Sequence, residues 1–174
     1  MTRLRLFFAA WPPGRVANAL YKWAKAASDE TGGRVTTAET IHLTLAFLGE
    51  VAAERATAAT EAARQVRGTA HRLPIEQARY WRHNRIVWVG PNETPPALAA
   101  LAAELKSALA QAGFELERRA FEAHVTLIRK GREPRMLPAL PEIDWPVGEF
   151  VLVRSRLSNE GSSYEVLERF PLAR

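Results

Sequence analysis

Several residue types that enzymes often depend on are scarce or missing in this chain of 174 residues. It has no cysteine, which excludes disulfides, thiol nucleophiles and zinc sites built on cysteine. No stretch approaches the roughly 20 consecutive apolar residues that a membrane-spanning helix needs. The apolar segment 6–11, which follows a basic start, is shorter than the core of a signal peptide and ends at Pro12. We therefore expect a cytoplasmic protein with no membrane association.

The charge balance favours basic residues, with 24 Lys and Arg against 19 Asp and Glu. A positive surplus of this kind favours association with polyanions such as nucleic acids. Hydrophobic residues make up 47% of the chain and charged residues 25%, which is ordinary for a folded globular protein. The length fits one domain, or two small lobes that share a core.

The tetrapeptide His-x-Thr-Leu occurs twice, at residues 42–45 and 124–127, and accounts for two of the four histidines. Each copy lies in an apolar run, so we predict strands over 41–48 and 121–128. Because side chains alternate between the two faces of a strand, the His and Thr of each copy share one face. Each copy therefore presents an imidazole with a hydroxyl beside it.

Such a pair of motifs suits acid–base chemistry at a phosphate. Histidine has an ordinary pKa near 6.5, so one imidazole can be neutral while the other is protonated at neutral pH. The neutral ring can take a proton from an attacking water, and the protonated ring can give one to the leaving oxygen. We predict that His42 and His124 are catalytic and that Thr44 and Thr126 bind the phosphate oxygens. This scheme requires no cofactor and no metal.

The other elements are predicted from the spacing of apolar residues and from the glycines and prolines at which helices and strands end. We expect strands at 3–10, 73–81 and 85–89, helices at 15–28, 51–67 and 96–112, and a hairpin formed by 149–157 and 163–170. In each half a helix ended by glycine leads into a His-x-Thr strand, and His124 follows His42 by 82 residues. This order predicts an α+β fold, with residues 1–174 forming one domain of two similar lobes, each an antiparallel sheet with helices outside.

Residues outside the motifs are further candidates for RNA binding, namely Phe8, Arg82, Arg85, Arg129 and Lys130. On the first strand, Phe7 or Phe8 can stack on a base, with core packing as the alternative for at least one of them. Strict strand alternation points Arg129 away from His124, so a solvated charge is the alternative for that residue. For Arg82 and Arg85 the choice is between a basic rim for RNA and a solvated hairpin face.

The motifs resemble those of the 2H phosphoesterases, a family defined by two His-x-Thr/Ser motifs. Residues 5–9, 41–51 and 121–129 look like the corresponding segments of its bacterial branch. That branch comprises the RNA 2′,3′-cyclic phosphodiesterases, also called 2′-5′ RNA ligases (the LigT or ThpR group). The likeness covers nearly the whole chain. One departure is Ala123, where the family commonly has proline before the second histidine.

The resemblance implies two pseudo-symmetric lobes around a central cleft, with one motif on each lobe. It also implies hydrolysis of 2′,3′-cyclic phosphates at RNA ends to 2′-phosphomonoesters, and a reversible, ATP-independent joining of tRNA halves through a 2′-5′ bond. Carried onto this sequence, His42 is the proton donor and His124 the proton acceptor. The partners expected are RNA ends with a cyclic phosphate, and we expect a monomer.

Two alternatives stay open at this stage. The first is a 2H enzyme whose substrate is a small cyclic nucleotide or a 2′-5′ linked oligonucleotide. The second is an RNA-binding module in which the histidines hold phosphate without catalysing a reaction.

Overall fold

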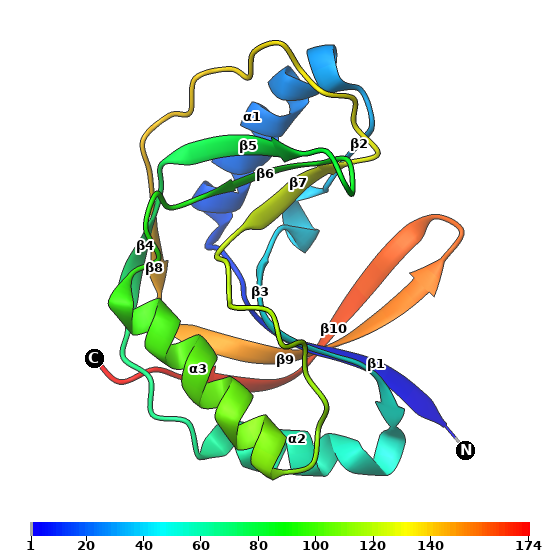
Figure 1. The fold of residues 1–174 in the computed structure, drawn as a ribbon, viewed down its shortest axis with the longest axis vertical. Helices are drawn as coiled ribbons and strands as arrows, with labels where there is room; N and C mark the ends of the chain where they lie inside the picture. The colour runs from blue at the N-terminus through cyan, green and yellow to red at the C-terminus, as the bar shows by residue number, and fades with distance from the viewer. Residues whose placement is uncertain (1) are drawn as a thin grey trace.

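The computed structural model describes residues 2–174, which form two four-stranded antiparallel sheets, a two-stranded sheet and three α-helices (Figure 1). The first sheet has the order β10-β9-β1-β3 and the second the order β2-β7-β6-β5. The strands of the first sheet are β1 (Arg3–Ala10), β3 (Leu43–Ala52), β9 (Glu149–Ser158) and β10 (Gly161–Pro171). Those of the second are β2 (Arg34–Val35), β5 (Gln77–Trp81), β6 (Ile86–Gly90) and β7 (Val125–Arg129). The predicted α+β class with antiparallel sheets is confirmed.

The helices cover the outer faces of the two large sheets. α1 (Gly14–Thr31) packs on β2 and β7 of the second sheet, while α3 (Pro96–Gln111) packs on β3 and α2 (Ala56–Arg64) on β10 of the first. Figure 1 shows α1 with β5–β7 in the upper part of the molecule and α2 and α3 below β1 and β9. Each long helix therefore packs on the sheet that carries the motif of the other half of the sequence. Each large sheet also contains strands from both halves of the chain.

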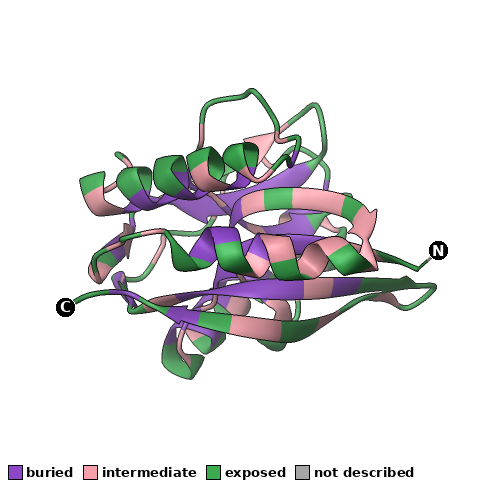
Figure 2. Cartoon of the chain, turned by 90° about the horizontal axis from the view of Figure 1, so that it is seen from below, coloured by how far each residue is buried: buried purple, intermediate pink, exposed green. Residues whose placement is uncertain are grey.

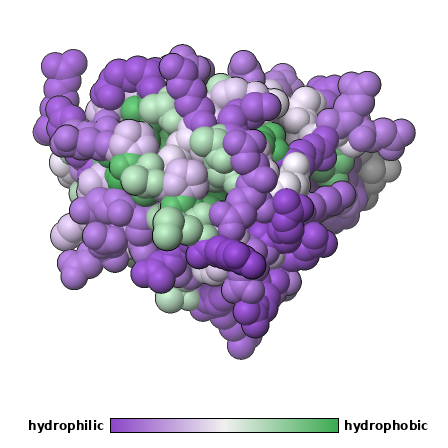
Figure 3. Space-filling view, turned by 90° about the horizontal axis from the view of Figure 1, so that it is seen from above, coloured by the Kyte–Doolittle hydropathy of each residue, from purple (hydrophilic) through white to green (hydrophobic). Residues whose placement is uncertain are grey.

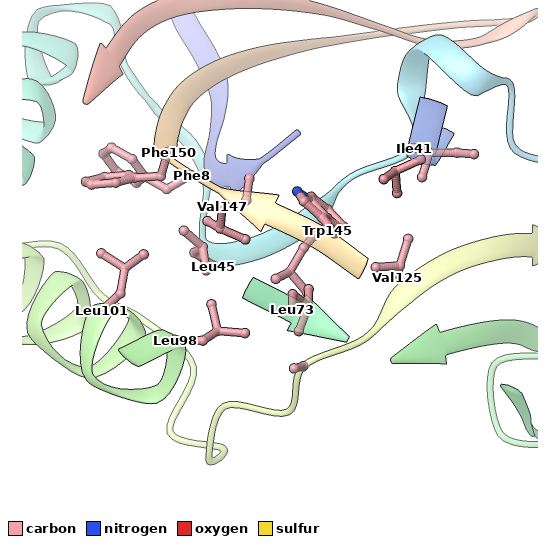
Figure 4. Close-up of a cluster of buried hydrophobic side chains, with 14 of the residues drawn as sticks. Phe8, Ile41, Leu45, Leu73, Leu98, Leu101, Val125, Trp145, Val147 and Phe150 are labelled. Carbon is pink, nitrogen blue, oxygen red and sulfur yellow. The ribbon is translucent and has the colours of Figure 1, made fainter. Parts of the chain in front are cut away.

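Buried apolar side chains from both sheets and from the helices form one continuous cluster. Figure 4 shows part of it, with Phe8 and Phe150 on the first sheet and Leu98 and Leu101 on α3. Trp145 is the largest fully buried side chain. The outward faces of the helices are exposed (Figure 2), and the face seen from above is largely hydrophilic (Figure 3). Within residues 2–174, no helix combines the length and apolar character needed to cross a membrane.

Several predicted elements differ from the structure. The single strand expected at 73–81 is interrupted at Glu76, giving β4 (His71–Ile75) and β5 in different sheets. β4 pairs with β8 (Ile143–Val147), a segment for which no element is expected from the sequence. The helix expected at 51–67 begins only at Ala56, because β3 continues to Ala52 and a 3-10 turn follows. Each difference arises from strand pairing over long sequence separations, which local periodicity does not report.

Candidate active site

Each motif histidine lies directly before a strand, whereas both were expected inside strands, at 41–48 and 121–128. His42 follows the 3-10 turn Ala38–Thr40 and the fully buried Ile41, and β3 begins at the next residue. His124 follows the buried Ala123 and precedes β7. A Cβ at Gly90 would lie 2.7 Å from the Ala123 carbonyl oxygen, so this close approach of β6 fixes the entry to the second motif without proline.

The two imidazoles are held by the same kind of hydrogen bond. Nδ1 of His42 lies 2.7 Å from the carbonyl oxygen of Thr40, and Nδ1 of His124 lies 2.9 Å from that of Glu122. In each case the carbonyl belongs to the residue two positions earlier. Because a carbonyl oxygen can only accept, each Nδ1 carries the proton and donates it. Nε2 of each neutral ring is then left as a proton acceptor, which is the arrangement that acid–base catalysis needs.

The histidines and threonines of both motifs line one cavity of about 350 Å³. The sequence prediction that the two copies come together is therefore matched by the geometry. Arg34, Arg129 and Asn84 also line this cavity, and the β9–β10 hairpin closes one side of it with Tyr164. Among residues 2–174, no three His, Asp or Glu side chains gather as a metal-binding cluster. The cavity offers two imidazoles, the hydroxyls of both motif threonines and two guanidinium groups, a set suited to a phosphate ester.

Aromatic rings surround His42 on several sides. Trp11 stacks on the imidazole with ring centroids 4.7 Å apart, and its Nε1 donates a 2.9 Å hydrogen bond to the Glu39 carbonyl. Phe7 and Tyr164 lie at centroid distances of 5.0 and 5.3 Å. This burial lowers the pKa of His42 from 6.5 to about 4, against the opposing effect of the Thr40 hydrogen bond. The positive charges of Arg129 and His124 lower it further.

His124 has a different aromatic environment. Trp81 lies 4.7 Å from its ring centroid and Trp88 lies 6.2 Å away in an edge-on geometry. Neither ring is parallel to the imidazole, since the interplanar angles are 58° and 77°. The backbone geometry of the two motifs is thus similar, whereas their surroundings are not. This asymmetry gives the two imidazoles different environments for their proton transfers.

A bulge in β7 brings Arg129 into the cavity. Trp88 pairs with Thr126 and Val87 with Ile128, so Leu127 has no partner of its own on β6. Leu127 and Ile128 are both fully buried, and the alternation of faces shifts by one residue after them. Arg129 therefore returns to the face of Thr126 and lines the cavity, contrary to the direction that strict alternation predicts.

Arg34 reaches the cavity from the short strand β2, which pairs with β7 so that Arg34 lies opposite Arg129. The preceding Gly33 has φ +84° and approaches the Arg129 carbonyl and the Gly131 amide so closely that a Cβ would collide with them. The Arg34 guanidinium donates a 2.6 Å hydrogen bond to the Glu160 carbonyl at the tip of the β9–β10 hairpin. This contact joins the two sheets across the cavity.

The other predicted RNA-binding residues lie elsewhere. The expectation for Phe8 is wrong, because its ring is fully buried against Phe150 and Phe170 and has no face free for a base. The Arg82 guanidinium is paired with Glu133 at 2.7 Å. Arg85 donates hydrogen bonds to the carbonyls that follow β7, at Lys130 and Gly131. Lys130 is exposed, and like Arg82 and Arg85 it does not line the cavity. RNA contacts by these three residues stay predictions.

Several residues of the site could not be identified from the sequence, among them Trp11, Arg34, Asn84 and Tyr164. Asn84 lies between the strands expected at 73–81 and 85–89, and Trp11 lies just after the strand expected at 3–10, so neither position indicates a functional site. The phenylalanine pair on β1 did carry a signal, since strand alternation requires Phe7 and Phe8 to face opposite sides. Both rings are buried, Phe8 in the main core and Phe7 beside His42.

Comparisons with known proteins agree with this geometry. The family model of the 2′-5′ RNA ligase superfamily matches residues 12–159. The RNA 2′,3′-cyclic phosphodiesterase of Escherichia coli is 35% identical over 170 residues, covering 97% of this chain and 96% of that protein. The protein of the same name from Thermus thermophilus is 32% identical over 186 residues, covering 97% and 90%.

Solved structures give the same result at the level of the fold. The crystal structure of E. coli LigT complexed with 3′-AMP superposes with a TM-score of 0.91 at 32% identity. The superposition covers 99% of this chain and 100% of that one. The resemblance that the two His-x-Thr motifs indicate is thereby confirmed. This chain belongs to the 2′-5′ RNA ligase superfamily.

Proposed function

We propose that this chain hydrolyses the 2′,3′-cyclic phosphate at an RNA end to a 2′-phosphomonoester. The observation that carries the proposal is the pair of His-x-Thr motifs that line one cavity, each with Nδ1 bound to the backbone carbonyl two residues earlier. Its relatives from E. coli and T. thermophilus are named RNA 2′,3′-cyclic phosphodiesterase, which supports this choice of substrate.

In the proposed reaction, water attacks phosphorus and the bond from phosphorus to O3′ breaks. His124 Nε2 takes the proton of the water, and protonated His42 gives its Nε2 proton to O3′. The hydroxyls of Thr44 and Thr126 and the Arg129 guanidinium donate hydrogen bonds to the two non-bridging oxygens, where negative charge increases. The phosphate stays on O2′. At the end of the reaction His124 is protonated and His42 is neutral.

The low pKa of His42 has a consequence for this scheme. In the free cavity the ring is neutral at pH 7, because burial opposes its charged form. As proton donor it must take up a proton together with the substrate, whose anionic phosphate stabilises the imidazolium. Reversal of the reaction exchanges the two roles, so the same ring also serves as a base toward a ribose 3′-hydroxyl.

Joining of RNA halves would use the same two histidines. If the 5′-hydroxyl of a second RNA replaces water as the nucleophile, the product is a 2′-5′ phosphodiester and the same two proton transfers take place. No ATP is consumed, because the cyclic phosphate already holds the activated bond. We include the joining of tRNA halves in the proposal as the reverse of 2′-5′ bond cleavage. A monomeric state and a cytoplasmic location stay predictions.

Replacement of either histidine tests the function. His42→Gln and His124→Gln should each lower kcat for adenosine 2′,3′-cyclic phosphate by about 100-fold or more. His71→Gln is the matched control, since His71 lies outside the cavity and its ring is bound only to the Thr69 carbonyl. The product should be 2′-AMP alone, identified by chromatography against 3′-AMP.

The same assay separates the alternatives. If both variants cleave at the wild-type rate, the enzymatic proposal fails, and retained RNA binding would then favour the binding module. Activity should persist in EDTA, because the scheme assigns no step to a metal. Loss of activity in EDTA, with recovery on adding a divalent cation, would contradict this part.

A further inference from the structure

Arg34 lines the catalytic cavity, yet the proposed reaction assigns no step to it. It lies directly opposite Arg129 in the pairing of β2 with β7, so two guanidinium groups come from neighbouring positions on adjacent strands. Like charges in this arrangement repel each other and destabilise the folded state. No carboxylate within residues 2–174 forms an ion pair with either group, so the repulsion is not offset within the chain. Two adjacent guanidinium groups without anionic partners are typical of a site that binds phosphate.

The cyclic phosphate alone accounts for only one of these two cations. A 2′,3′-cyclic phosphodiester carries one negative charge, and in the proposed reaction this charge is met by the Arg129 guanidinium and the imidazolium of His42. The positive charge of Arg34 then has no partner in a complex with a free cyclic nucleotide. A substrate with a second phosphate near Arg34 would supply that partner.

The position of Arg34 in the cavity indicates which phosphate this is. A strand rises by about 3.3 Å per residue, so Arg129 lies roughly 15 Å along the chain from His124, and Arg34 shares this end of the cavity with it. The positive charge of Arg129 lowers the pKa of His42, which places His42 near the same end. The proposed reaction puts O3′ beside His42. The ribose of the terminal nucleotide, and with it O5′, then lies on the side of Arg34.

The β9–β10 hairpin holds the Arg34 side chain in place. β1 pairs with β9 only as far as Ser155, so residues 156–163 form a two-stranded arm, which Figure 1 shows rising toward the lobe that carries β2 and β7. The Arg34 guanidinium donates its hydrogen bond to the Glu160 carbonyl at the tip of this arm. A Cβ at Gly161 would lie 2.5 Å from the same guanidinium, so this close contact requires glycine. One carbonyl uses only part of the five N–H donors of an arginine, which leaves donors for a phosphate.

We propose that Arg34 binds the phosphate on O5′ of the terminal nucleoside, which in RNA is the phosphodiester that joins this nucleoside to the rest of the chain. Arg34 thereby makes the enzyme prefer RNA ends to free cyclic nucleosides, whereas Arg129 contacts the reacting phosphate. The inference rests on the proposed function, because the position of O5′ follows from the placement of O3′ beside His42. It makes Arg34 a residue that determines specificity and takes no part in the proton transfers.

Two dinucleotides test this assignment. Both are ApA with a 2′,3′-cyclic phosphate, and in one of them a methylphosphonate replaces the linking phosphodiester and removes its charge. A hydrogen bond to a charged group contributes about 1.5–3 kcal/mol, so wild-type kcat/KM should be about 10- to 150-fold higher for the charged dinucleotide. Arg34→Gln should reduce this ratio to about twofold or less. Arg79→Gln should preserve it, because Arg79 lies on β5 of the same sheet, is exposed and does not line the cavity.

The ratio of the two dinucleotides separates phosphate recognition from a structural role of Arg34. Displacement of the hairpin would change kcat/KM for both dinucleotides by one common factor and leave their ratio as it is. Equal kcat/KM values in wild type, or an unchanged ratio in Arg34→Gln, refute the role of Arg34, and the hydrolase function stands.

A mononucleotide distinguishes the two sources of a phosphate on O5′. Adenosine 2′,3′-cyclic phosphate is compared with the same nucleotide that carries a 5′-phosphate as well. An Arg34-dependent gain from the 5′-phosphate means that the site accepts a free nucleotide as well as a chain. A gain limited to the charged dinucleotide means that it accepts only a phosphodiester within a chain. Either result supports the proposal.

Binding decides the role of Arg34 if wild type cleaves none of these substrates, in which case the proposed function fails. Adenosine 2′,5′-bisphosphate should then bind about tenfold or more tightly than 2′-AMP, as measured by calorimetry, because only the bisphosphate carries a phosphate on O5′. Arg34→Gln should remove this difference, and Arg79→Gln should keep it. Equal affinities of the two ligands for wild type would refute the phosphate site at Arg34.

Discussion

The indole of Trp11 stacks on the imidazole of His42, with ring centroids 4.7 Å apart and planes inclined by 16°. The indole is held in place by its own hydrogen bond to the Glu39 carbonyl, just before the first motif. A stacked ring removes water from one face of the imidazole and opposes protonation. Trp11 therefore links the packing at the end of β1 to the proton chemistry of the first motif.

Removal of this ring should raise the pKa of His42. Activity requires one proton on the pair of histidines, so kcat/KM falls at low pH, where His42 becomes protonated in the free protein. In wild type this acid limb should lie near pH 4, the value to which burial lowers the pKa of His42. Trp11→Ala should move the limb toward pH 6.5, measured as kcat/KM against pH and as an NMR titration of the His42 ring.

Trp11→Phe is the conservative control for this experiment. It keeps an aromatic face on the imidazole and should leave the acid limb closer to its wild-type position. A merely structural role for Trp11 would lower the amount of folded protein without changing the pH at which His42 titrates. If the NMR titration of His42 in Trp11→Ala matches that of wild type, the indole does not control this pKa.

The same burial makes stability depend on pH. The folded pKa of His42 is lowered to about 4, while the unfolded chain has its ordinary value of 6.5. Between these values the unfolded state binds more protons, so stability is fully present above pH 6.5 and is lost as pH falls. The loss reaches about 3 kcal/mol at most near pH 4. His42→Gln should show a weaker fall in stability between about pH 7.5 and pH 4.5, measured by urea denaturation.

His83→Gln is the control for this measurement, because it removes a histidine that is exposed. Its fall in stability over the same pH range should match that of wild type. His42→Gln also loses the hydrogen bond to Thr40, so the comparison concerns the change with pH and not stability at one pH. Parallel pH dependences for wild type and His42→Gln would contradict the burial of an uncharged His42.

The pattern of residues was enough to predict the motifs, the α+β class and most strands, because each depends on local periodicity. Strand β1 and the strand that follows each motif histidine are amphipathic or wholly apolar in the way the prediction requires. Strands β2 and β8 were missed because they are short and pair with segments far away in the sequence. Their stability comes from partners that a local pattern does not contain.

The site could be predicted only in part for a related reason. His42, Thr44, His124 and Thr126 belong to a repeated motif, so their proximity could be inferred from the repeat. The direction of the Arg129 side chain could not be predicted, because the bulge at Leu127 depends on the register of β7 against β6. Tyr164 and Trp11 reach His42 from β10 and from the end of β1, which are neighbours of that histidine only in the folded sheet.

The bulge in β7 places Arg129 at the cavity and leaves Lys130 outside it, a difference that a pair of variants can test. With adenosine 2′,3′-cyclic phosphate as substrate, Arg129→Gln should raise KM by about tenfold or more, because a charge-assisted hydrogen bond to phosphate contributes about 1.5–3 kcal/mol. Lys130→Gln should change KM by about twofold or less, because this side chain does not line the cavity. Equal effects of the two changes would mean that Arg129 acts through overall charge and not through contact.

The assignment of His42 to the ribose 3′-oxygen can be tested by a substrate that reacts in the opposite direction. In a nucleoside 2′-(4-nitrophenyl phosphate), the 3′-hydroxyl attacks phosphorus and gives its proton to the histidine beside O3′. The 4-nitrophenolate leaves without needing a proton, so the other histidine becomes dispensable.

By microscopic reversibility, the base toward the 3′-hydroxyl is the residue that donates to O3′ in hydrolysis. His124→Gln should therefore retain most of the release of 4-nitrophenolate, followed by absorbance, whereas His42→Gln should lose about 100-fold or more. Both variants should be inactive on the cyclic phosphate, which needs both proton transfers. The opposite pattern, with His42→Gln active and His124→Gln inactive, would exchange the two roles. Activity of both variants would mean that neither histidine transfers a proton at O3′, and the assignment would have to be abandoned.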